Sequence, residues 1–269
     1  MTTITSRGNP AVKAMAKLVA STAERKRAGL SVLEGPHLVA SLLDSGRALQ
    51  SLVVSQSASA DAQVAKIMMR AGEAVLTIVS DGVFDAISTV KEPFGVMAAA
   101  PTPTGEAVPP DAALCLLLED IQDPGNVGTL IRSAAAAGAG HVLLSPTCAF
   151  AWSPKVLRAG QGSHFALNIV EGVDLVAFLE AYKGTSVALA SRGKRSLHAV
   201  DLTGPTAIAV GNEGAGLSQW VLGATAVRAH IPMPGRTESL NAGVAGSIAL
   251  FEVVRQRIAR TTAVSHAIR

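Results

Sequence analysis

Aromatic residues are scarce in this chain. Phe, Trp and Tyr together make up 3% of its 269 residues, with two Trp and a single Tyr. Nucleic-acid readers that rely on rows of stacked rings need many more aromatic side chains than this. The composition therefore disfavours a recognition surface built from stacked aromatic rings.

Cysteine is equally rare. Cys115 and Cys148 are the two cysteines, and such a pair provides neither a disulfide framework nor the ligand spacing of a metal site. Cys115 stands in the apolar run at residues 113–118, where it is expected to be a small buried hydrophobic residue. We therefore expect no metal.

Long apolar stretches are missing as well. The first residues lack the apolar core of a signal peptide, and no uncharged segment has the length and hydrophobicity needed to span a bilayer. The expectation is a cytoplasmic protein without a membrane partner.

Hydrophobic residues, in contrast, make up 49% of the chain, together with 25 Gly and 13 Pro. This balance is typical of a compact α/β protein. The formal net charge is +3, from 23 basic and 20 acidic residues. A modest basic excess is compatible with an RNA or phosphate ligand, although many enzymes share it.

A proline-rich segment divides the chain. Residues 101–110 contain four prolines and no apolar periodicity, which indicates a stiff, extended linker. The sequence thus predicts a small α/β domain at residues 1–100, a linker at 101–110 and a larger domain at 111–269.

The first part alternates helix and strand patterns. Helices are predicted from Pro10, from Pro36 to Leu42 and at 61–70, and strands at 30–33, 52–54, 75–79 and 94–98. Its basic residues cluster early and have two interpretations, a solvated helix face, which is the more common case, or a weak RNA-binding patch. They are Arg7, Lys13, Lys17, Arg25, Lys26 and Arg27.

The second part contains five predicted strands separated by helical patterns. The strands are at 114–118, 141–144, 186–190, 207–210 and 227–231. This alternation predicts a mostly parallel sheet covered on both faces. Ligands of such sheets bind beyond the carboxyl ends of the strands, and three polar turns follow strands of this part.

The first turn, at residues 123–126, reads Asp-Pro-Gly-Asn. Pro124 and Gly125 form a tight turn, and Asn126 is a good N-cap for the helix that follows. Arg132 comes about two helical turns later, close enough to reach back to the same edge of the sheet. One interpretation is a cap and a surface arginine; the other is an amide and a guanidinium that hold a ribose or phosphate.

The second turn, at residues 211–216, reads Gly-Asn-Glu-Gly-Ala-Gly. It differs from the Gly-x-Gly-x-x-Gly of dinucleotide domains and lacks the expected acidic partner, so a nicotinamide cofactor is disfavoured. Three glycines allow backbone amides to approach a ligand closely. Glu213 is then the acidic residue that is expected to face that ligand.

The third turn, at residues 231–241, precedes an apolar helix pattern that includes Val244, Ile248 and Phe251. It combines a proline-stiffened turn with a basic residue, a hydroxyl and an amide, the last two from Ser239 and Asn241. Alone, Ser239 is an ordinary N-cap. Because all three turns follow strands, one edge of the sheet is expected to gather them into a single site.

Together the three turns resemble the motifs of the SpoU/TrmH family of SPOUT methyltransferases. Residues 123–132, 211–216 and 231–241 match motifs 1, 2 and 3, so that the resemblance covers the whole second part. The first part resembles, more weakly, the family's ribosomal-protein-like substrate-binding domain, through residues 9–13 and 33–35.

The resemblance implies an enzyme that methylates the 2′-hydroxyl of an RNA ribose with S-adenosylmethionine. It also implies a C-terminal trefoil knot in the α/β fold and a homodimer whose sites lie near the interface. By motif position, the candidate cofactor-binding residues are Gly211, Gly216, Ile231, Met233, Ser239 and Leu240, and the candidate catalytic residues are Asn126, Arg132, Glu213, Ser239 and Asn241.

Arg132 corresponds to the residue to which family accounts assign activation of the hydroxyl. A guanidinium is protonated at ordinary pH and is a poor general base. The first role expected of Arg132 is therefore to hold the phosphate beside the target ribose. Removal of the hydroxyl proton, as a general base, is an additional role. Asn126 and Asn241 are expected to orient the hydroxyl and the loop, and Glu213 to orient Arg132.

One departure from the family stands at residues 162–169, where Asn168 replaces a frequent proline. His164 in the same run is a possible base, but a lone histidine there is more often structural. The expected substrate is ribosomal RNA of the 23S type, because the N-terminal domain is present and the tail beyond Arg260 is short. The alternatives are a tRNA 2′-O-methyltransferase and a non-catalytic RNA-binding or ribosome-assembly protein with this fold.

Overall fold

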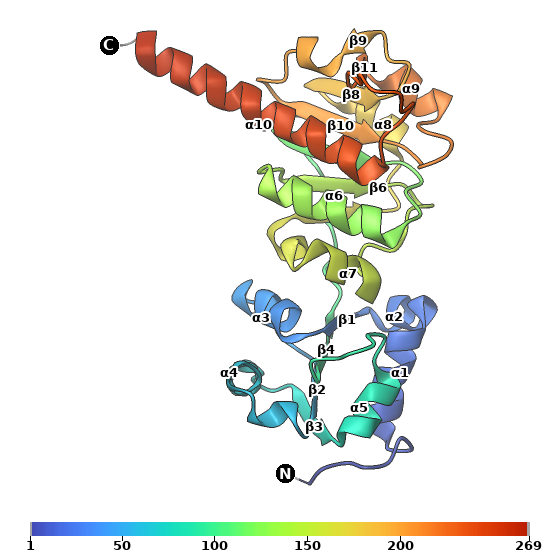
Figure 1. Cartoon of the computed structure of the whole chain (residues 1–269), viewed down its shortest axis with the longest axis vertical. Helices are drawn as coiled ribbons and strands as arrows, with labels where there is room; N and C mark the ends of the chain where they lie inside the picture. The colour runs from blue at the N-terminus through green and yellow to red at the C-terminus, as the bar shows by residue number, and fades with distance from the viewer. Residues whose placement is uncertain (1, 268–269) are drawn as a thin grey trace. The chain divides into compact units, whose positions relative to one another are not determined.

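The computed structural model describes residues 2–267, which form two compact units (Figure 1). The first unit comprises the chain up to Pro103 together with Trp152–Phe165. The second comprises Thr104–Ala151 and the chain from Ala166 onward. The sequence-based limits assign residues 111–269 to one domain, so the placement of the 152–165 segment differs from that prediction.

In the part of the first unit that the structure describes, four strands form a mixed sheet. These are β1 (Leu30–Glu34), β2 (Ser51–Ser55), β3 (Val75–Val79) and β4 (Val96–Pro101), in the order β1-β4-β2-β3. β4 is antiparallel to both of its neighbours, and β2 and β3 are parallel. All four strands were predicted; β3 has the predicted ends, and the ends of the other three differ by at most three residues.

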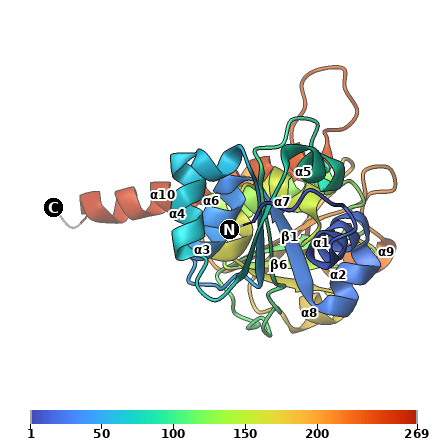
Figure 2. The same cartoon turned by 90° about the horizontal axis from the view of Figure 1, so that it is seen from below.

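Helices cover both faces of this sheet. α1 (Pro10–Ala20) and α5 (Asp81–Ile87) pack their apolar side chains on one face, and α3 (Pro36–Asp44) and α4 (Ala62–Arg70) lie together on the other side (Figure 2). Asn9 caps α1 by accepting from the backbone N–H of Ala11 at 2.9 Å. Asp61 caps α4, so these two predicted helix starts are confirmed.

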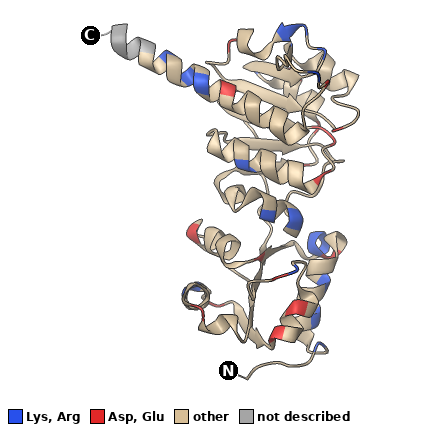
Figure 3. Cartoon of the chain, viewed as in Figure 1, with Lys and Arg blue, Asp and Glu red and all other residues tan. Residues whose placement is uncertain are grey.

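Lys and Arg residues lie along α1 and along α2 (Thr22–Ala28), where the ribbon of Figure 3 is coloured blue. Lys13, Lys17 and Arg27 are exposed there. Arg25 is buried instead, and its guanidinium donates to the carbonyls of Leu18 and Val19. Arg25 therefore holds the α1–α2 junction together and is removed from the surface available to RNA.

The segment at residues 152–165 joins the first unit through α7 (Pro154–Gly160), which packs against β1. Glu34, at the end of β1, is a buried carboxylate that accepts hydrogen bonds from Ser88, from Thr89 and, at 3.4 Å, from Arg158 of α7. His164 is fully buried, with its ring 5.3 Å from that of Trp152. Its position agrees with a structural role.

Within the described residues, the second unit contains seven strands. They are β5 (Leu114–Leu118), β6 (His141–Leu144), β7 (Asn168–Glu171), β8 (Thr185–Leu189), β9 (Arg195–Ser196), β10 (Thr206–Val210) and β11 (Val227–His230). Their order is β7-β6-β5-β10-β8-β11-β9, and every neighbouring pair is parallel. The predicted parallel sheet is confirmed, whereas β7 and β9 were not predicted.

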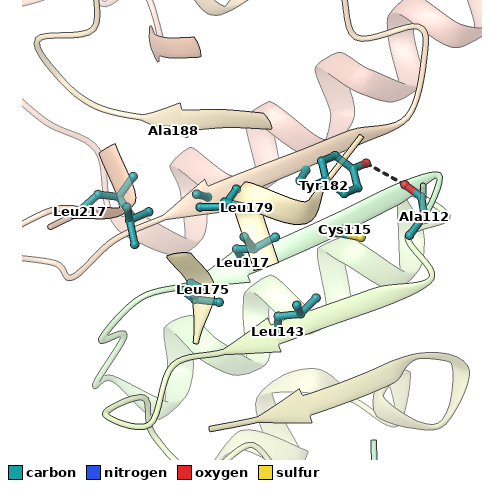
Figure 4. Close-up of a cluster of buried hydrophobic side chains, with 12 residues drawn as sticks. Ala112, Cys115, Leu117, Leu143, Leu175, Leu179, Tyr182, Ala188 and Leu217 are labelled. Carbon is teal, nitrogen blue, oxygen red and sulfur yellow. Dashed lines mark hydrogen bonds between the residues drawn. The ribbon is translucent and has the colours of Figure 1, made fainter. Parts of the chain in front are cut away.

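One face of this sheet is covered by α8 (Leu175–Ala181) and α9 (Gln219–Ala224), whose apolar residues form a core with the strands (Figure 4). Cys115 is fully buried in this core, and burial raises the pKa of its thiol to about 12. Tyr182 closes the cluster by donating to the carbonyl of Ala112 at 2.7 Å. The expected role of Cys115 as a hydrophobic residue is confirmed.

The other face is covered by α6 (Pro124–Ala136) and α10 (Ala242–Ala267), which pack against each other; α10 also packs on β10. Figures 1 and 2 show the C-terminal part of α10 extending away from the rest of its unit. Within residues 2–267, no helix combines the length and the hydrophobicity that crossing a bilayer requires.

The linker has no regular secondary structure from residue 102 to residue 109. Its middle is fastened by Asn168, whose Oδ1 accepts from the N–H of Glu106 at 2.9 Å and whose Nδ2 donates to the carbonyl of Glu106 at 3.0 Å. The residue that departs from the family pattern thus ties the linker to the start of β7.

Candidate active site

A cavity of about 580 Å³ opens at the carboxyl ends of three neighbouring strands of the second unit. Its walls are the segments that follow β8, β10 and β11, together with the first residues of α10. β8 lies between β10 and β11 in the sheet, which brings these three segments side by side. The position agrees with the rule that ligands of parallel sheets bind beyond the carboxyl edge.

The loop after β10 depends on close backbone packing. A Cβ atom on Gly211 would overlap the backbone of Gly216 and Leu217, and Gly216 itself has a φ of 72°. Asn212 braces the same loop, because its Oδ1 accepts from the N–H groups of Gly214 and Ala215, each at 2.9 Å. Glycine is thus required at the base of the loop, which then presents its backbone to the cavity.

The loop after β11 is largely exposed and ends at α10. Asn241 caps this helix by accepting from the N–H of Val244 at 3.2 Å. Ser239, which the sequence alone indicated as a cap, lies two residues too early and contributes to the cavity wall instead.

Three side chains, one from each motif, are joined by hydrogen bonds beside the cavity. Asn126 Nδ2 donates to Glu213 Oε1 at 2.8 Å, and Asn241 Nδ2 donates to Asn126 Oδ1 at 2.9 Å. Glu213 also accepts, at 3.4 Å, from the backbone N–H of Asp123. Because Asn126 has only 9% of its surface exposed, these bonds have little competition from water.

The N-cap predicted at Asn126 is wrong. Pro124 is the first residue of α6, and Asp123 caps the helix by accepting from the N–H of Asn126 at 2.8 Å. Proline at the first helical position favours a start immediately before it. The amide of Asn126 is therefore released from capping and bridges the first and second motifs.

Arg132 is exposed on α6. Neither a hydrogen bond nor an ion pair connects it to any residue that the structure describes. Of the five candidate catalytic residues, the structure joins Asn126, Glu213 and Asn241 to one another and places Ser239 on the cavity wall. It leaves Arg132 outside this network.

All six candidate cofactor-binding residues line the cavity, at positions 211, 216, 231, 233, 239 and 240. Their contact with a cofactor stays a prediction. The segment after β8 was not predicted to take part, although Leu189, Ala190 and Arg192 also line the cavity. The sequence did contain a signal for this segment, because it follows the strand predicted at 186–190 and therefore lies at the same edge of the sheet.

The family model of the SpoU rRNA methylases matches residues 113–251, which include β5 to β11 and all three loops. The chain belongs to the SpoU methylase family. The resemblance found in the sequence is thereby confirmed. A second family model, the MRM3-like substrate-binding domain, matches residues 9–98 of the first unit.

Relatives of the SpoU family align with nearly the whole chain. An uncharacterised tRNA/rRNA methyltransferase of Synechocystis sp. is 34% identical, over 96% of this chain and 96% of the relative. The 23S rRNA (guanosine(2553)-2′-O)-methyltransferase RlmP of Bacillus subtilis is 30% identical, over 94% and 99%. Both domains are thus shared with these proteins.

Solved SpoU structures agree with the fold. The AdoMet-bound rRNA methyltransferase from Sinorhizobium meliloti is 29% identical with a TM-score of 0.84, over 94% of this chain and 97% of that one. AviRb from Streptomyces viridochromogenes is 26% identical with a TM-score of 0.82, over 93% and 98%.

Proposed function

We propose that this protein transfers a methyl group from S-adenosylmethionine to a ribose 2′-hydroxyl of ribosomal RNA. The observation that carries the proposal is the cavity, whose wall contains residues of motifs 2 and 3 and is tied to motif 1 by Asn126. The relatives named as rRNA methyltransferases and the AdoMet-bound neighbour support this assignment.

The cavity fits the cofactor. A volume of about 580 Å³ lies within the range of roughly 300–1,000 Å³ found for small-molecule sites. Leu189, Ile231 and Leu240 supply apolar walls. The loop at residues 211–216 supplies backbone donors and acceptors. When bound, the cofactor supplies an electrophilic methyl group on its sulfonium sulfur.

The protein's own residues then position the RNA. As the bond between the 2′-oxygen and the methyl carbon forms, the hydroxyl must lose its proton, and orientation of the reacting atoms contributes much of the acceleration. Asn126 and Asn241 fix Glu213 at the rim of the cavity. Arg132, cationic and exposed, is suited to hold a backbone phosphate rather than to remove the proton.

Calorimetry with S-adenosylmethionine tests the cofactor part of the proposal. The wild type is expected to bind it and Gly211→Ala to lose most of the affinity, because the added methyl group displaces the backbone of Gly216 and Leu217. Gly223→Ala in α9 is the matched control, since a Cβ there meets nothing within 4 Å. Absence of binding by the wild type would favour the non-catalytic RNA-binding alternative.

Methyl transfer tests the residue roles. Asn126→Ala and Arg132→Ala are each expected to lower transfer by about 100-fold while cofactor affinity is retained. Lys183→Ala, which removes another exposed cation of the same unit, is the control. Full transfer by both variants would overturn these roles. Mapping 2′-O-methyl sites in cells with and without the protein distinguishes ribosomal RNA from tRNA.

We also propose the trefoil knot and the homodimer. The knot is supported by the way the segments after β8, β10 and β11 surround one cavity before α10 returns against α6. A crystal structure in which the 231–241 loop does not thread through an earlier segment would contradict it.

A second copy of the chain is the proposed partner of α10. This helix exposes Val244, Phe251 and Ile258 at a spacing of seven residues, with 47%, 48% and 62% of their surfaces accessible. A seven-residue repeat of apolar side chains lies along one helix face and favours helix–helix packing.

We also propose that the protein is located in the cytoplasm, together with its proposed substrate, ribosomal RNA.

A further inference from the structure

The two tryptophans of the chain have opposite environments. Trp152 is buried, with 3% of its surface exposed, whereas Trp220 on α9 is 79% exposed. In a chain with so few aromatic residues, an indole held in solvent contributes little to the core. Its large flat surface is available to a ligand.

Trp220 forms part of a second cleft, with a volume of about 530 Å³, in the same unit. Pro146, Val173, Val176 and Val221 supply further apolar surface to this cleft. α9 separates the cleft from the active-site cavity, because Gln219 and Leu222 line the cavity while Trp220 and Val221 line the cleft. Because the cavity and the cleft share α9, an RNA strand that extends from the cavity across this helix meets the indole.

The charges of the cleft select which part of an RNA can enter. Its two ionisable residues, Glu119 and Asp174, are both acidic. Glu119 accepts from the N–H of Ser218 at 2.7 Å, and Asp174 caps α8. Carboxylates repel a phosphate but accept hydrogen bonds from the amino groups of bases. The cleft is thus suited to a base rather than to the sugar-phosphate backbone.

We propose that Trp220 stacks against an unpaired base of the ribosomal RNA that neighbours the target ribose. Proteins that bind single-stranded RNA commonly stack splayed-out bases on aromatic side chains. One exposed tryptophan beside the cavity provides such a contact without the rows of rings that the composition disfavours. This inference rests on the proposed function, because the RNA must bind at the cavity.

Fluorescence gives a direct test, since Trp220 and Trp152 are the only tryptophans. Ribosomal RNA purified from cells that lack the protein is expected to quench the emission of the wild type. Trp220→Phe, which retains Trp152 alone, should show no quenching beyond the absorbance of the RNA. Equal quenching in both proteins would overturn the proposal.

Steady-state kinetics supply the second readout. Trp220→Ala is expected to raise the KM for RNA by about 10-fold and to change kcat less, whereas Trp220→Phe restores most of the affinity. The salt dependence of RNA binding should be the same in Trp220→Ala and the wild type, because stacking neutralises no phosphate. Met69→Ala, which removes an exposed apolar residue of α4, is the control.

Three outcomes separate this inference from the proposed function. Normal cofactor binding and methyl transfer with an unchanged KM in Trp220→Ala would overturn the stacking alone. Absence of cofactor binding and of transfer in the wild type would overturn the proposed function. A change of oligomeric state in Trp220→Ala, measured by sedimentation, would assign the indole to a protein interface and so overturn the RNA contact.

Discussion

At the scale of single residues, three asparagines use both ends of the amide group. Asn212 donates to the carbonyl of Asp120 while accepting from two N–H groups of its own loop. Asn126 donates to Glu213 and accepts from Asn241, which in turn caps α10. A carboxylate of the same shape has no proton to donate at neutral pH. The amide is therefore the functional group that each of these positions requires.

Glu252 is a buried carboxylate whose ionisation is coupled to folding. Its carboxylate is 5% exposed and accepts from Arg255 at 2.7 and 2.8 Å, from Gln256 at 2.8 Å and from His198 at 3.2 Å. The hydrogen bonds from Arg255, followed by those from Gln256 and His198, lower the pKa of Glu252 from 4.5 to about 2, although burial opposes this shift. The folded state therefore binds this proton less tightly than the unfolded state does.

The expected result is a pH-dependent contribution to the free energy of unfolding. It is present above pH 4.5 and is lost as the pH falls from 4.5 towards 2. At neutral pH, Glu252→Gln should be less stable than the wild type by on the order of 1–3 kcal/mol, and the difference should shrink in acid. Denaturant unfolding of both proteins at a series of pH values measures this difference in the free energy of unfolding. Glu73→Gln, at an exposed position, is the control, and a difference that does not depend on pH would contradict the assignment.

At the scale of elements, the start of α10 has two separable roles, both carried by Asn241. Its Oδ1 caps the helix and its Nδ2 connects the helix to Asn126. Asn241→Ser keeps a capping oxygen but loses the connection, so stability should be nearly unchanged and methyl transfer should fall. Asn241→Ala loses both, with a cost of about 1 kcal/mol in stability as well. Thermal unfolding and a transfer assay on the two variants measure this, and equal activity in Asn241→Ser and the wild type would contradict it.

Elements with long apolar patterns could be predicted from the sequence, and those without could not. β5 stands out as an uninterrupted apolar run, and α1 has Pro10 after its cap. β9 contains two residues and carries no periodic signal. The cap of α6 was misplaced by three residues because both Asp123 and Asn126 are good caps, and Pro124 decides between them.

The sequence predicted that the three turns form one site, but it did not predict which side chains meet there. The three turns follow strands, which indicates that they share one edge of the sheet. The bond between Asn126 and Glu213 requires β5 and β10 to be neighbours, with Leu118 opposite Val210. The segment after β8 joins the cavity because β8 lies between β10 and β11. Strand order of this kind depends on tertiary packing, which local sequence patterns do not encode.

At the scale of the whole molecule, the exposed apolar stripe of α10, formed by Val244, Phe251 and Ile258, predicts a homodimer. Phe251→Asp places a charge in the proposed interface and should convert a dimer to a monomer, because burial of an unpaired carboxylate is costly. Ala259→Asp, on an exposed position of the same helix outside the stripe, should leave the dimer intact. Sedimentation equilibrium measures both variants, and a wild type that is monomeric at micromolar concentration would overturn the prediction.

The bond between Asn126 and Asn241 joins residues separated by 115 positions in the chain. During synthesis, the first unit and α6 leave the ribosome well before this bond can form. A nascent chain that stops before the third motif has the cavity walls that follow β8 and β10, but it lacks the wall that follows β11, and Asn126 lacks its second partner, Asn241. The cavity and the side-chain network beside it are therefore complete only after translation has passed the third motif.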